Sequence, residues 1–299
     1  MKLKDKWKRG LPYVGNKGQK VEQIMEVLPD GKRLVDVFGG GGCVSLTAAS
    51  SGKYEEVIYN DRRKTVVNLL KALIEDNPHF DLMKYVYIDR ETFNNWRDNM
   101  PDSIERTLVL TVWSFSNNLK DYLWGKKIEK EKLQMARAIF FGDTGTQLDE
   151  IYEYTKNETT ISGKYAVYHK WRRKRLEQLQ QLEKHKQLQQ IEQLQQLERF
   201  QQLQQLQQLE FLTLDYQSLK IGPDDVVYCD PPYIGTSKDY GGFDDEAFQS
   251  WLAKCPAKKI YISEYTQLPH TEVAFVLGKK HSLTSTGKRR DELLLRVVH

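Results

Sequence analysis

One short stretch of the sequence combines residue types that could do chemistry. An apolar run, Val226–Cys229, is followed directly by Asp230, Pro231, Pro232 and Tyr233. The run predicts a fully buried strand, which must end at the prolines because proline has no backbone N–H to donate. A carboxylate, a rigid carbonyl and an aromatic ring would then stand together at the carboxyl end of that strand. Ligands of open α/β sheets bind at this edge, so we expect part of a functional site here.

A glycine-rich turn is the second candidate. The predicted strand 33–38 contains Asp36 and Phe38 and runs into Gly39–Gly42, and a helix of small apolar residues is expected over 43–50. Glycines let backbone N–H groups approach a ligand closely, whether a phosphate, a dinucleotide or an amino-acid carboxylate. The turn matches neither G-x-G-x-x-G nor a G-K-[ST] motif, which disfavours dinucleotides and nucleoside triphosphates.

An acid also ends the next predicted strand, 56–61. Asp61 occupies the position that typically contacts ribose hydroxyls in α/β folds of this kind. The same residue could instead cap the helix expected over about 64–75. The combination with the glycine-rich turn favours the ligand contact.

Strands and helices alternate around these motifs. The order strand, glycine-rich turn, helix, strand, acid and helix is typical of a parallel α/β sheet. We therefore predict a doubly wound α/β fold with an antiparallel edge. Further strands are expected over 210–216, 226–229, 259–265, 273–277 and 292–298, and further helices over 21–28 and 244–254.

The segment 78–175 differs in character because it is aromatic and charged, with polar and aromatic residues interleaved over 114–127. We interpret it as an inserted helical subdomain. It ends in a basic cluster, 169–175, which is either a surface for a polyanion or a solvated helix face. Helices are predicted near 89–99, 103–114 and 129–141.

The segment 176–212 carries apolar residues, mostly leucine, at every third position, interrupted only at His185. An α-helix turns about 100° per residue, so this repeat would wind around it, whereas a 3₁₀-helix would hold the leucines on one line. Long 3₁₀ runs are uncommon, so both helical forms stay open, beside a solenoid-like or disordered form. The predicted domain boundaries are 1–77, 78–175, 176–212 and 213–299.

Composition narrows the class of protein. The 299 residues carry a net charge of +4, which is compatible with a polyanionic partner. Cys43, Cys229 and Cys255 have no CxxC spacing, and no His, Cys and acid cluster has metal-ligand spacing, so neither disulfides nor a metal site is expected. The basic N-terminus lacks an apolar signal region and no window reaches 18 apolar residues, so we expect a cytoplasmic protein without a membrane partner.

The order of the motifs is specific. Lys17 in a glycine-containing loop, Asp-x-Phe-Gly-Gly-Gly, Asn60-Asp61, a long insertion, Asp215-Tyr216 and Asp-Pro-Pro-Tyr together resemble the Dam-like adenine-N6 DNA methyltransferases, in the form carried by phages and prophages. The match spans about residues 9–299, apart from the leucine–glutamine repeat. The resemblance implies a Rossmann-like sheet that binds S-adenosylmethionine, with an inserted helical target-recognition subdomain.

The resemblance also assigns roles on the cofactor side. Lys17 would pair with the cofactor carboxylate, Asp61 would take the ribose hydroxyls, and Asp215 would meet the adenine amine of the cofactor. The expected cofactor-binding residues are Tyr13, Lys17, Asp36, Phe38, Gly39, Gly40, Gly41, Asp61, Asp215 and Tyr216.

Amine methylation suits the Asp-Pro-Pro-Tyr turn. N6 of adenine is a poor nucleophile because its lone pair is delocalised into the ring. The Asp230 carboxylate and the Pro231 carbonyl can each accept one N6 hydrogen, which favours a pyramidal nitrogen aimed at the methyl group. The base must leave the duplex, and Tyr233 offers a face for stacking. The expected catalytic residues are Asp230, Pro231, Pro232 and Tyr233.

Double-stranded DNA is the expected partner. The repeat could extend a DNA-contacting arm, mediate self-association or be a tolerated insertion. Two other functions stay open: N4-cytosine methylation, although that group more often has Ser in place of the first Asp, and a DNA-binding or scaffolding protein without catalysis. Asparagine and lysine suit base edges, and arginine suits phosphates. The candidate DNA-binding residues are Asn117, Asn118, Lys120, Tyr122, Lys170, Arg172, Arg173 and Arg175.

Overall fold

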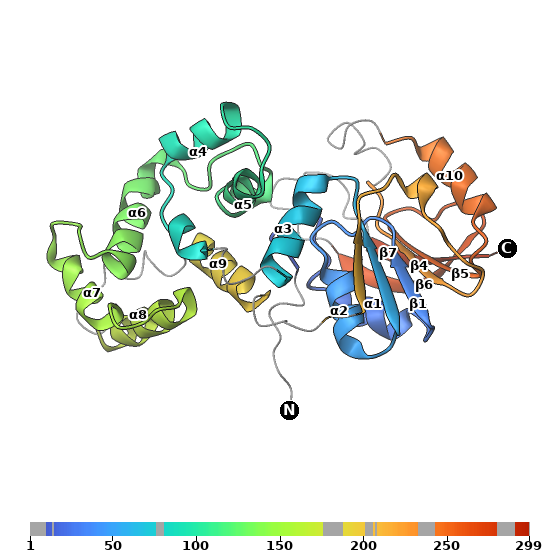
Figure 1. Ribbon diagram of the computed structural model, residues 1–299, viewed down its shortest axis with the longest axis horizontal. Coiled ribbons are helices and arrows are strands. Elements are labelled where there is room, and N and C mark those ends of the chain that lie inside the picture. The colour runs from blue at the N-terminus through green and yellow to red at the C-terminus, as the bar shows by residue number, and fades with distance from the viewer. Residues whose placement is uncertain are drawn as a thin grey trace. The chain divides into compact units, whose positions relative to one another are not determined.

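The chain divides into two compact units by its internal contacts. The computed structural model describes residues 10–13, 15–75, 81–175, 188–200, 206, 208–232, 243–279 and 291–298 (Figure 1). Of these, the helical unit contains 12–13, 68–75, 81–175 and 188–200. The sheet unit contains 10–11, 15–67, 206, 208–232, 243–279 and 291–298.

The sheet unit is built on a seven-stranded sheet with the order β3-β2-β1-β4-β5-β7-β6. The strands from β3 to β5 in this order are parallel, whereas β7 runs antiparallel to both β5 and β6. The predicted mixed α/β fold with an antiparallel edge is therefore confirmed. The strands are β1 (Arg33–Asp36), β2 (Glu56–Asn60), β3 (Leu209–Leu212), β4 (Val226–Cys229), β5 (Lys259–Glu264), β6 (Thr271–Lys279) and β7 (Asp291–Val297).

The direction of the strand order reverses between β1 and β4. From β1 the sheet continues to β2 and β3, and from β4 it continues to β5. Asp36 pairs in register with Tyr228, so the segments that follow these two strands start side by side. A crevice outside the carboxyl ends of the strands at such a reversal is where open α/β sheets bind ligands.

Alternation along the strands builds one apolar layer on each face of the sheet. Leu34 packs into the layer covered by α1 and α2, and Val35 packs into the layer covered by α10. Successive side chains of a strand point to opposite faces, so a strand covered on both faces is continuously apolar. This is why β4 is an unbroken apolar run, and why Leu34 and Val35 of β1 are both apolar. The covering helices are α1 (Val21–Val27), α2 (Cys43–Ser51) and α10 (Asp245–Lys254).

In the helical unit, α4 packs against α5, and α7 packs against both α6 and α8. Asp89 and Ser103 cap α4 and α5 by accepting the backbone N–H of Thr92 and Arg106. Among the helices that the structure describes, none has the length and apolar character needed to cross a membrane. The remaining elements of the helical unit are η3 (Leu82–Tyr85), α4 (Arg90–Asp98), α5 (Ile104–Val112), η4 (Phe115–Asn117), α6 (Lys126–Phe140), η5 (Gln147–Asp149), α7 (Glu150–Thr155), α8 (Ile161–Arg175) and α9 (Gln189–Phe200). Helix α3 (Lys64–Ile74) begins in the sheet unit and ends in the helical unit, and η7 (Tyr216–Ser218) belongs to the sheet unit.

Part of the leucine–glutamine repeat forms the α-helix α9, which packs against α5 and α8. A three-residue spacing winds around an α-helix, so the buried face is wide and takes in Gln190 as well. The 3₁₀ form is therefore wrong for 189–200, and Leu209–Leu212 is a strand. The fully buried apolar residues of α9 are Ile191, Leu194, Leu197 and Phe200. Repeat positions 176–187, 201–205 and 207 lie outside the described residues.

Glu198 ties α9 to the start of α8. Its carboxylate accepts the backbone N–H groups of Ile161 at 2.8 Å and Ser162 at 3.0 Å. The first N–H groups of a helix have no partner within the helix, and a carboxylate there satisfies them and complements the helix dipole. This segment of the repeat is thus an integral part of the helical unit.

Leu194→Ala should destabilise the helical unit. Leu194 is fully buried, and truncating a buried leucine typically costs about 2–5 kcal/mol because a cavity remains. Glu192→Gln, on the exposed side of the same helix, is the matched control and should change stability by less than about 0.5 kcal/mol. Urea denaturation of the full chain, followed by circular dichroism, measures both. Equal stability of the two variants would contradict the packing of α9.

Candidate active site

Four of the predicted site residues stand at the ends of neighbouring parallel strands. Asp36 ends β1, Asp61 follows β2, and Asp230 follows β4, while Asp215 comes shortly after β3. Neighbouring parallel strands end at the same edge of a sheet, so the topology brings the four acids to one edge.

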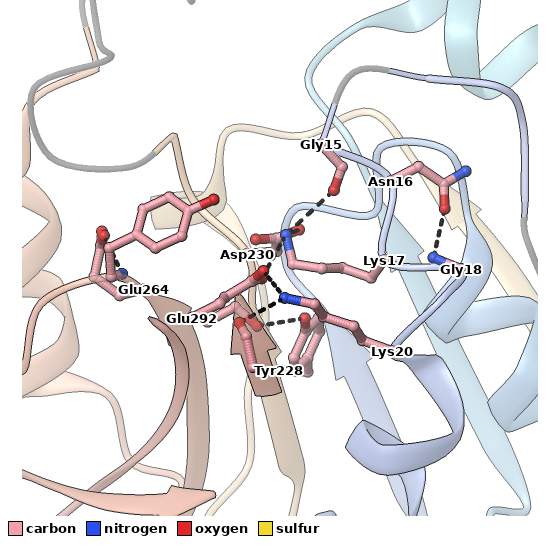
Figure 2. A network of polar contacts seen from close by, with 12 residues as sticks. Gly15, Asn16, Lys17, Gly18, Lys20, Tyr228, Asp230, Glu264 and Glu292 are labelled. Atoms are coloured by element: carbon pink, nitrogen blue, oxygen red, sulfur yellow. Dashed lines mark hydrogen bonds and ion pairs between the residues drawn. The ribbon is translucent and has the colours of Figure 1, made fainter. Parts of the chain in front are cut away.

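Lys17 lies in the loop before α1 and points toward the end of β4 (Figure 2). Its Nζ is 2.6 Å from Oδ2 of Asp230 and 3.3 Å from Oε1 of Glu292, and it donates to the carbonyl of Gly15 at 3.2 Å. Burial alone would lower the pKa of Lys17, but the charges of Asp230 and Glu292 raise it above its ordinary value. The cation predicted to meet a cofactor carboxylate is therefore paired with two carboxylates of the protein.

Glu292, near the start of β7, was missed in the sequence. Its side chain is 4% exposed, and its Oε2 lies 2.5 Å from Nζ of Lys20, which also donates to the carbonyl of Gly278 at 3.3 Å. The sequence does contain a pattern that could have identified it: Glu292 is two residues from Leu294, so both side chains lie on the same, buried face of the strand. An acid at a buried position of a strand requires a charged or hydrogen-bonding partner.

The glycine-rich turn is held by the strand beside it. The N–H of Gly39 donates to the carbonyl of Asn60 at 2.7 Å, and that of Gly40 donates to Oδ2 of Asp61 at 3.0 Å. A Cβ on Gly39 would come within 2.2 Å of the ring of Tyr59. Gly39 is therefore required for steric reasons.

Asp36 is almost fully buried. The hydroxyl of Ser45 donates to its Oδ2 at 2.6 Å, whereas its Oδ1 has no hydrogen-bond partner among the described residues. Burial raises the pKa of Asp36 to about 7, opposed by the Ser45 bond and reinforced by the charges of Asp230 and Asp61. A buried carboxylate oxygen without a donor is costly, and a ligand with an N–H group could supply one.

Asp61 and Asp215 both make local bonds to the backbone. Oδ1 of Asp61 accepts the N–H of Arg63 at 2.8 Å, and Oδ1 of Asp215 accepts the N–H of Gln217 at 3.0 Å. A carboxylate has about four lone-pair sites, so these bonds leave the predicted ligand contacts possible. In the part of the chain that the structure describes, no three His, Cys, Asp or Glu side chains are grouped to hold a metal ion.

Phe38 and Tyr216 belong to an aromatic cluster that the sequence revealed only in part. Their ring centroids are 5.5 Å apart. Phe243 and Phe248 lie 5.7 and 5.6 Å from Phe38, and Trp251 lies 5.3 Å from Tyr216. The last three residues come from α10 and the segment before it, far along the chain, so no local spacing could have predicted them. The cluster presents aromatic surface that suits a planar ligand.

The Asp-Pro-Pro turn borders this cluster. Pro231 and Pro232 line a small crevice together with Phe243, Phe248 and the buried Glu264. Figure 2 shows Glu264 near the Asp230 network. Tyr233 lies outside the described residues, so its stacking role stays a prediction.

Tyr122 is an interior residue of the helical unit. Its hydroxyl donates to the carbonyl of Ile88 at 2.8 Å, its ring stacks on Trp113 at 6.2 Å, and the guanidinium of Arg90 lies 4.7 Å over it. Only 6% of Tyr122 is exposed. This burial argues against the DNA contact predicted for it.

The loop after α5 contains Asn117, Asn118 and Lys120. Asn117 has a φ of 56° and donates its amide to the carbonyl of Thr111 at 2.8 Å. Oδ1 of Asn118 accepts the N–H groups of Lys120 and Asp121, each at 2.9 Å. The two asparagines thus shape the loop, a task for which short amide side chains are suited. Lys120 is exposed, and a DNA contact by these three residues stays a prediction.

The residues of the basic cluster on α8 differ in solvent exposure. Lys170 and Arg173 are exposed, whereas Arg172 is 6% exposed, which argues against its predicted phosphate contact. The side chain of Arg175 is outside what the structure describes.

Tyr13, predicted to face the cofactor, is buried and belongs to the helical unit by its contacts, so its role also stays a prediction.

Comparison with known proteins agrees with the motif order. A DNA N-6-adenine-methyltransferase of Escherichia phage P1 is 39% identical to the chain over 61 residues, which are 20% of this chain and 8% of the phage protein. The chain thus matches only a small part of that relative's length. Residues 13–259 match the model of a single family, and this range includes both the glycine-rich turn and the Asp230 turn. The chain belongs to the D12 class N6 adenine-specific DNA methyltransferases.

Proposed function

We propose that the protein transfers a methyl group from S-adenosylmethionine to N6 of an adenine in double-stranded DNA. The observation that carries this proposal is the position of Asp230. Its carboxylate follows the carboxyl end of β4, paired with the buried Lys17 at 2.6 Å, and the neighbouring strand β1 ends at Asp36, which is in register with Tyr228 of β4. A hydrogen-bond acceptor for an amine and a candidate cofactor site therefore lie next to each other between β1 and β4, where the strand order reverses.

The residues around Asp36 fit S-adenosylmethionine. The methionine end of this cofactor carries an ammonium group, which would supply the donor that Oδ1 of Asp36 lacks. The cluster around Phe38 offers aromatic surface. The bound cofactor supplies an electrophilic methyl group. The residues proposed to hold it are Asp36, Phe38, Gly39, Gly40, Gly41, Asp61, Asp215 and Tyr216.

Asp230 and Pro231 would hold the target base. The Asp230 carboxylate and the Pro231 carbonyl accept the two N6 hydrogens, which turns the nitrogen lone pair toward the methyl donor. The contact between Lys17 and Oδ2 of Asp230 limits rotation of the carboxylate before the base arrives. The contribution of the protein is orientation and preorganised charge.

We further propose that the helical unit contacts DNA. The exposed cations Lys120, Lys170 and Arg173 suit phosphates, and they lie on the loop after α5 and on α8. The proposed recognition subdomain extends beyond 175 to include α9, because α9 packs on α5 and α8. Self-association through α9 is not part of the proposal, since its apolar residues are already buried within the unit.

The test uses the full chain, S-adenosylmethionine with a labelled methyl group, and double-stranded DNA of mixed sequence. Digestion of the product to nucleosides should recover the label in N6-methyl-2′-deoxyadenosine. Label in N4-methyl-2′-deoxycytidine would select the cytosine alternative instead. Binding of DNA without any transfer would select the alternative of a non-catalytic DNA-binding protein.

Cofactor binding should depend on pH through Asp36. Its pKa of about 7 means that the ionised form, which pairs with the cofactor ammonium, grows between pH 6 and 8. Affinity should therefore rise roughly tenfold over this range if only the ionised form binds. Asp36→Asn should bind weakly and without this dependence. Isothermal titration calorimetry at several pH values measures it, and an identical pH dependence in the variant would contradict the role.

Stability gives an independent check on Asp36. Its folded pKa lies above the unfolded value of about 3.9, so the stability it contributes is present below that value and is lost as pH rises through about 7. Relative to wild type, Asp36→Asn should be more stable at pH 8 than at pH 4. Urea denaturation at the two pH values would show this, and no change in relative stability would refute it.

A further inference from the structure

Four charged side chains of alternating sign form a continuous chain at the edge of the site (Figure 2). Asp230 lies 2.6 Å from Lys17, Lys17 lies 3.3 Å from Glu292, and Glu292 lies 2.5 Å from Lys20. They come from three parts of the sequence: the segment before α1, the turn after β4, and the start of β7. The two acids and two bases together are electrically neutral.

Lys17 has several oxygen partners in this arrangement. Its ammonium has three N–H donors, and among the described residues it contacts oxygens of Asp230, Glu292 and the carbonyl of Gly15. Lys17 is 6% exposed and Glu292 is 4% exposed, so water cannot easily replace either partner. Removing one member of a buried charge network leaves the others without compensation. Asp230 is the shorter contact of the Lys17 ammonium at 2.6 Å, and Glu292 holds it from a second direction at 3.3 Å.

We propose that Glu292 is a positioning residue for methyl transfer, acting on Asp230 through Lys17. It holds the ammonium where it contacts Oδ2 of Asp230 and so keeps the carboxylate in the orientation that accepts an N6 hydrogen. This inference rests on the proposed function. Glu292 itself touches neither the base nor the cofactor in this scheme.

The test compares Glu292→Gln with wild type. Glutamine has the same shape but no charge, so the ammonium of Lys17 loses the anionic contact at 3.3 Å. We expect kcat to fall roughly 10- to 100-fold, as small misplacements of catalytic groups do, while the cofactor Kd changes less than about threefold. The control is Glu272→Gln, the same substitution at an exposed glutamate paired with Arg296 on the same sheet. It should keep wild-type kcat.

A double-mutant cycle with Lys17→Met separates positioning from a purely structural role. If Glu292 acts through Lys17, the double variant should transfer methyl groups at the rate of Lys17→Met alone. A structural role predicts additive losses.

The outcomes distinguish the two proposals. The positioning role alone is overturned if wild type is active and Glu292→Gln has the same kcat. It is also overturned if wild type is active and the losses in the cycle are additive. Glu292→Asp guards against misfolding, because it restores the charge and should recover part of kcat. If the folded wild-type protein binds cofactor but transfers no methyl group to DNA, the proposed function fails and the positioning role falls with it.

Discussion

Asp230→Ala should reduce methyl transfer to DNA by about a thousandfold or more while cofactor affinity stays within about threefold of wild type. The carboxylate that accepts an N6 hydrogen is lost, so the amine keeps its lone pair delocalised in the ring. The cofactor contacts proposed on β1 and β2 do not involve Asp230. Single-turnover transfer of labelled methyl and calorimetric cofactor titration measure the two effects separately.

Asp224→Ala is the matched control for this experiment. Asp224 is an exposed acid just before β4, at the opposite end of the strand that Asp230 follows. The Asp224→Ala variant should transfer methyl groups at the wild-type rate. Lys17 keeps Glu292 as a partner in Asp230→Ala, so the variant should fold. Substantial transfer by folded Asp230→Ala would remove this carboxylate from the mechanism.

Gly10→Ala should weaken cofactor binding at least tenfold. Gly10 has a φ of 66°, and a Cβ there would come within 2.3 Å of the carbonyl oxygen of Gly41 and 2.7 Å of the backbone nitrogen of Cys43. Backbone atoms cannot rotate away as a side chain can, so the glycine-rich turn must shift. Leu11, the next residue, donates its N–H to the same Gly41 carbonyl at 2.7 Å, so this bond would be disturbed as well.

Gly15→Ala separates the steric clash from backbone strain. Gly15 has a φ of 79°, but a Cβ there meets nothing within 4 Å. Its cost should be the left-handed conformation alone, about 1 kcal/mol or somewhat more, with little change in cofactor affinity. Calorimetric titration and thermal unfolding of both variants provide the comparison. Equal loss of affinity in the two would mean that strain, and not displacement of the turn, causes the effect.

Local sequence patterns were sufficient to predict the strands of the sheet. The short apolar stretches before Asp36, Asp61 and Asp230 predicted β1, β2 and β4, because strands covered on both faces are apolar in their interior. The prolines after Asp230 marked the end of β4 for a local reason, the missing N–H. The caps at Asp89 and Ser103 likewise depend on residues only three positions apart.

The repeat shows where a pattern alone was insufficient. A three-residue period is compatible with a 3₁₀ or an α-helix, and the choice depends on what surrounds the segment. Burial of Ile191, Leu194 and Leu197 against α5 and α8 accompanies the α-helical form, whose buried face is wide enough to include glutamine. Tyr122 and Arg172 are a similar case, since their residue types suit DNA but packing places them in the interior.

The sequence by itself determined the family, the α/β sheet and the acids at the strand ends, because each depends on short stretches whose chemistry is legible locally. Only the tertiary structure decided the partners of Lys17. The ammonium meets Asp230 and Glu292, which lie more than 200 residues away along the chain, because the end of β4 and the start of the antiparallel β7 lie at the same edge of the sheet, with β5 between the two strands. Ion pairs between distant segments leave no periodic signal, since nothing in the spacing of residues encodes which charges a fold will bring together.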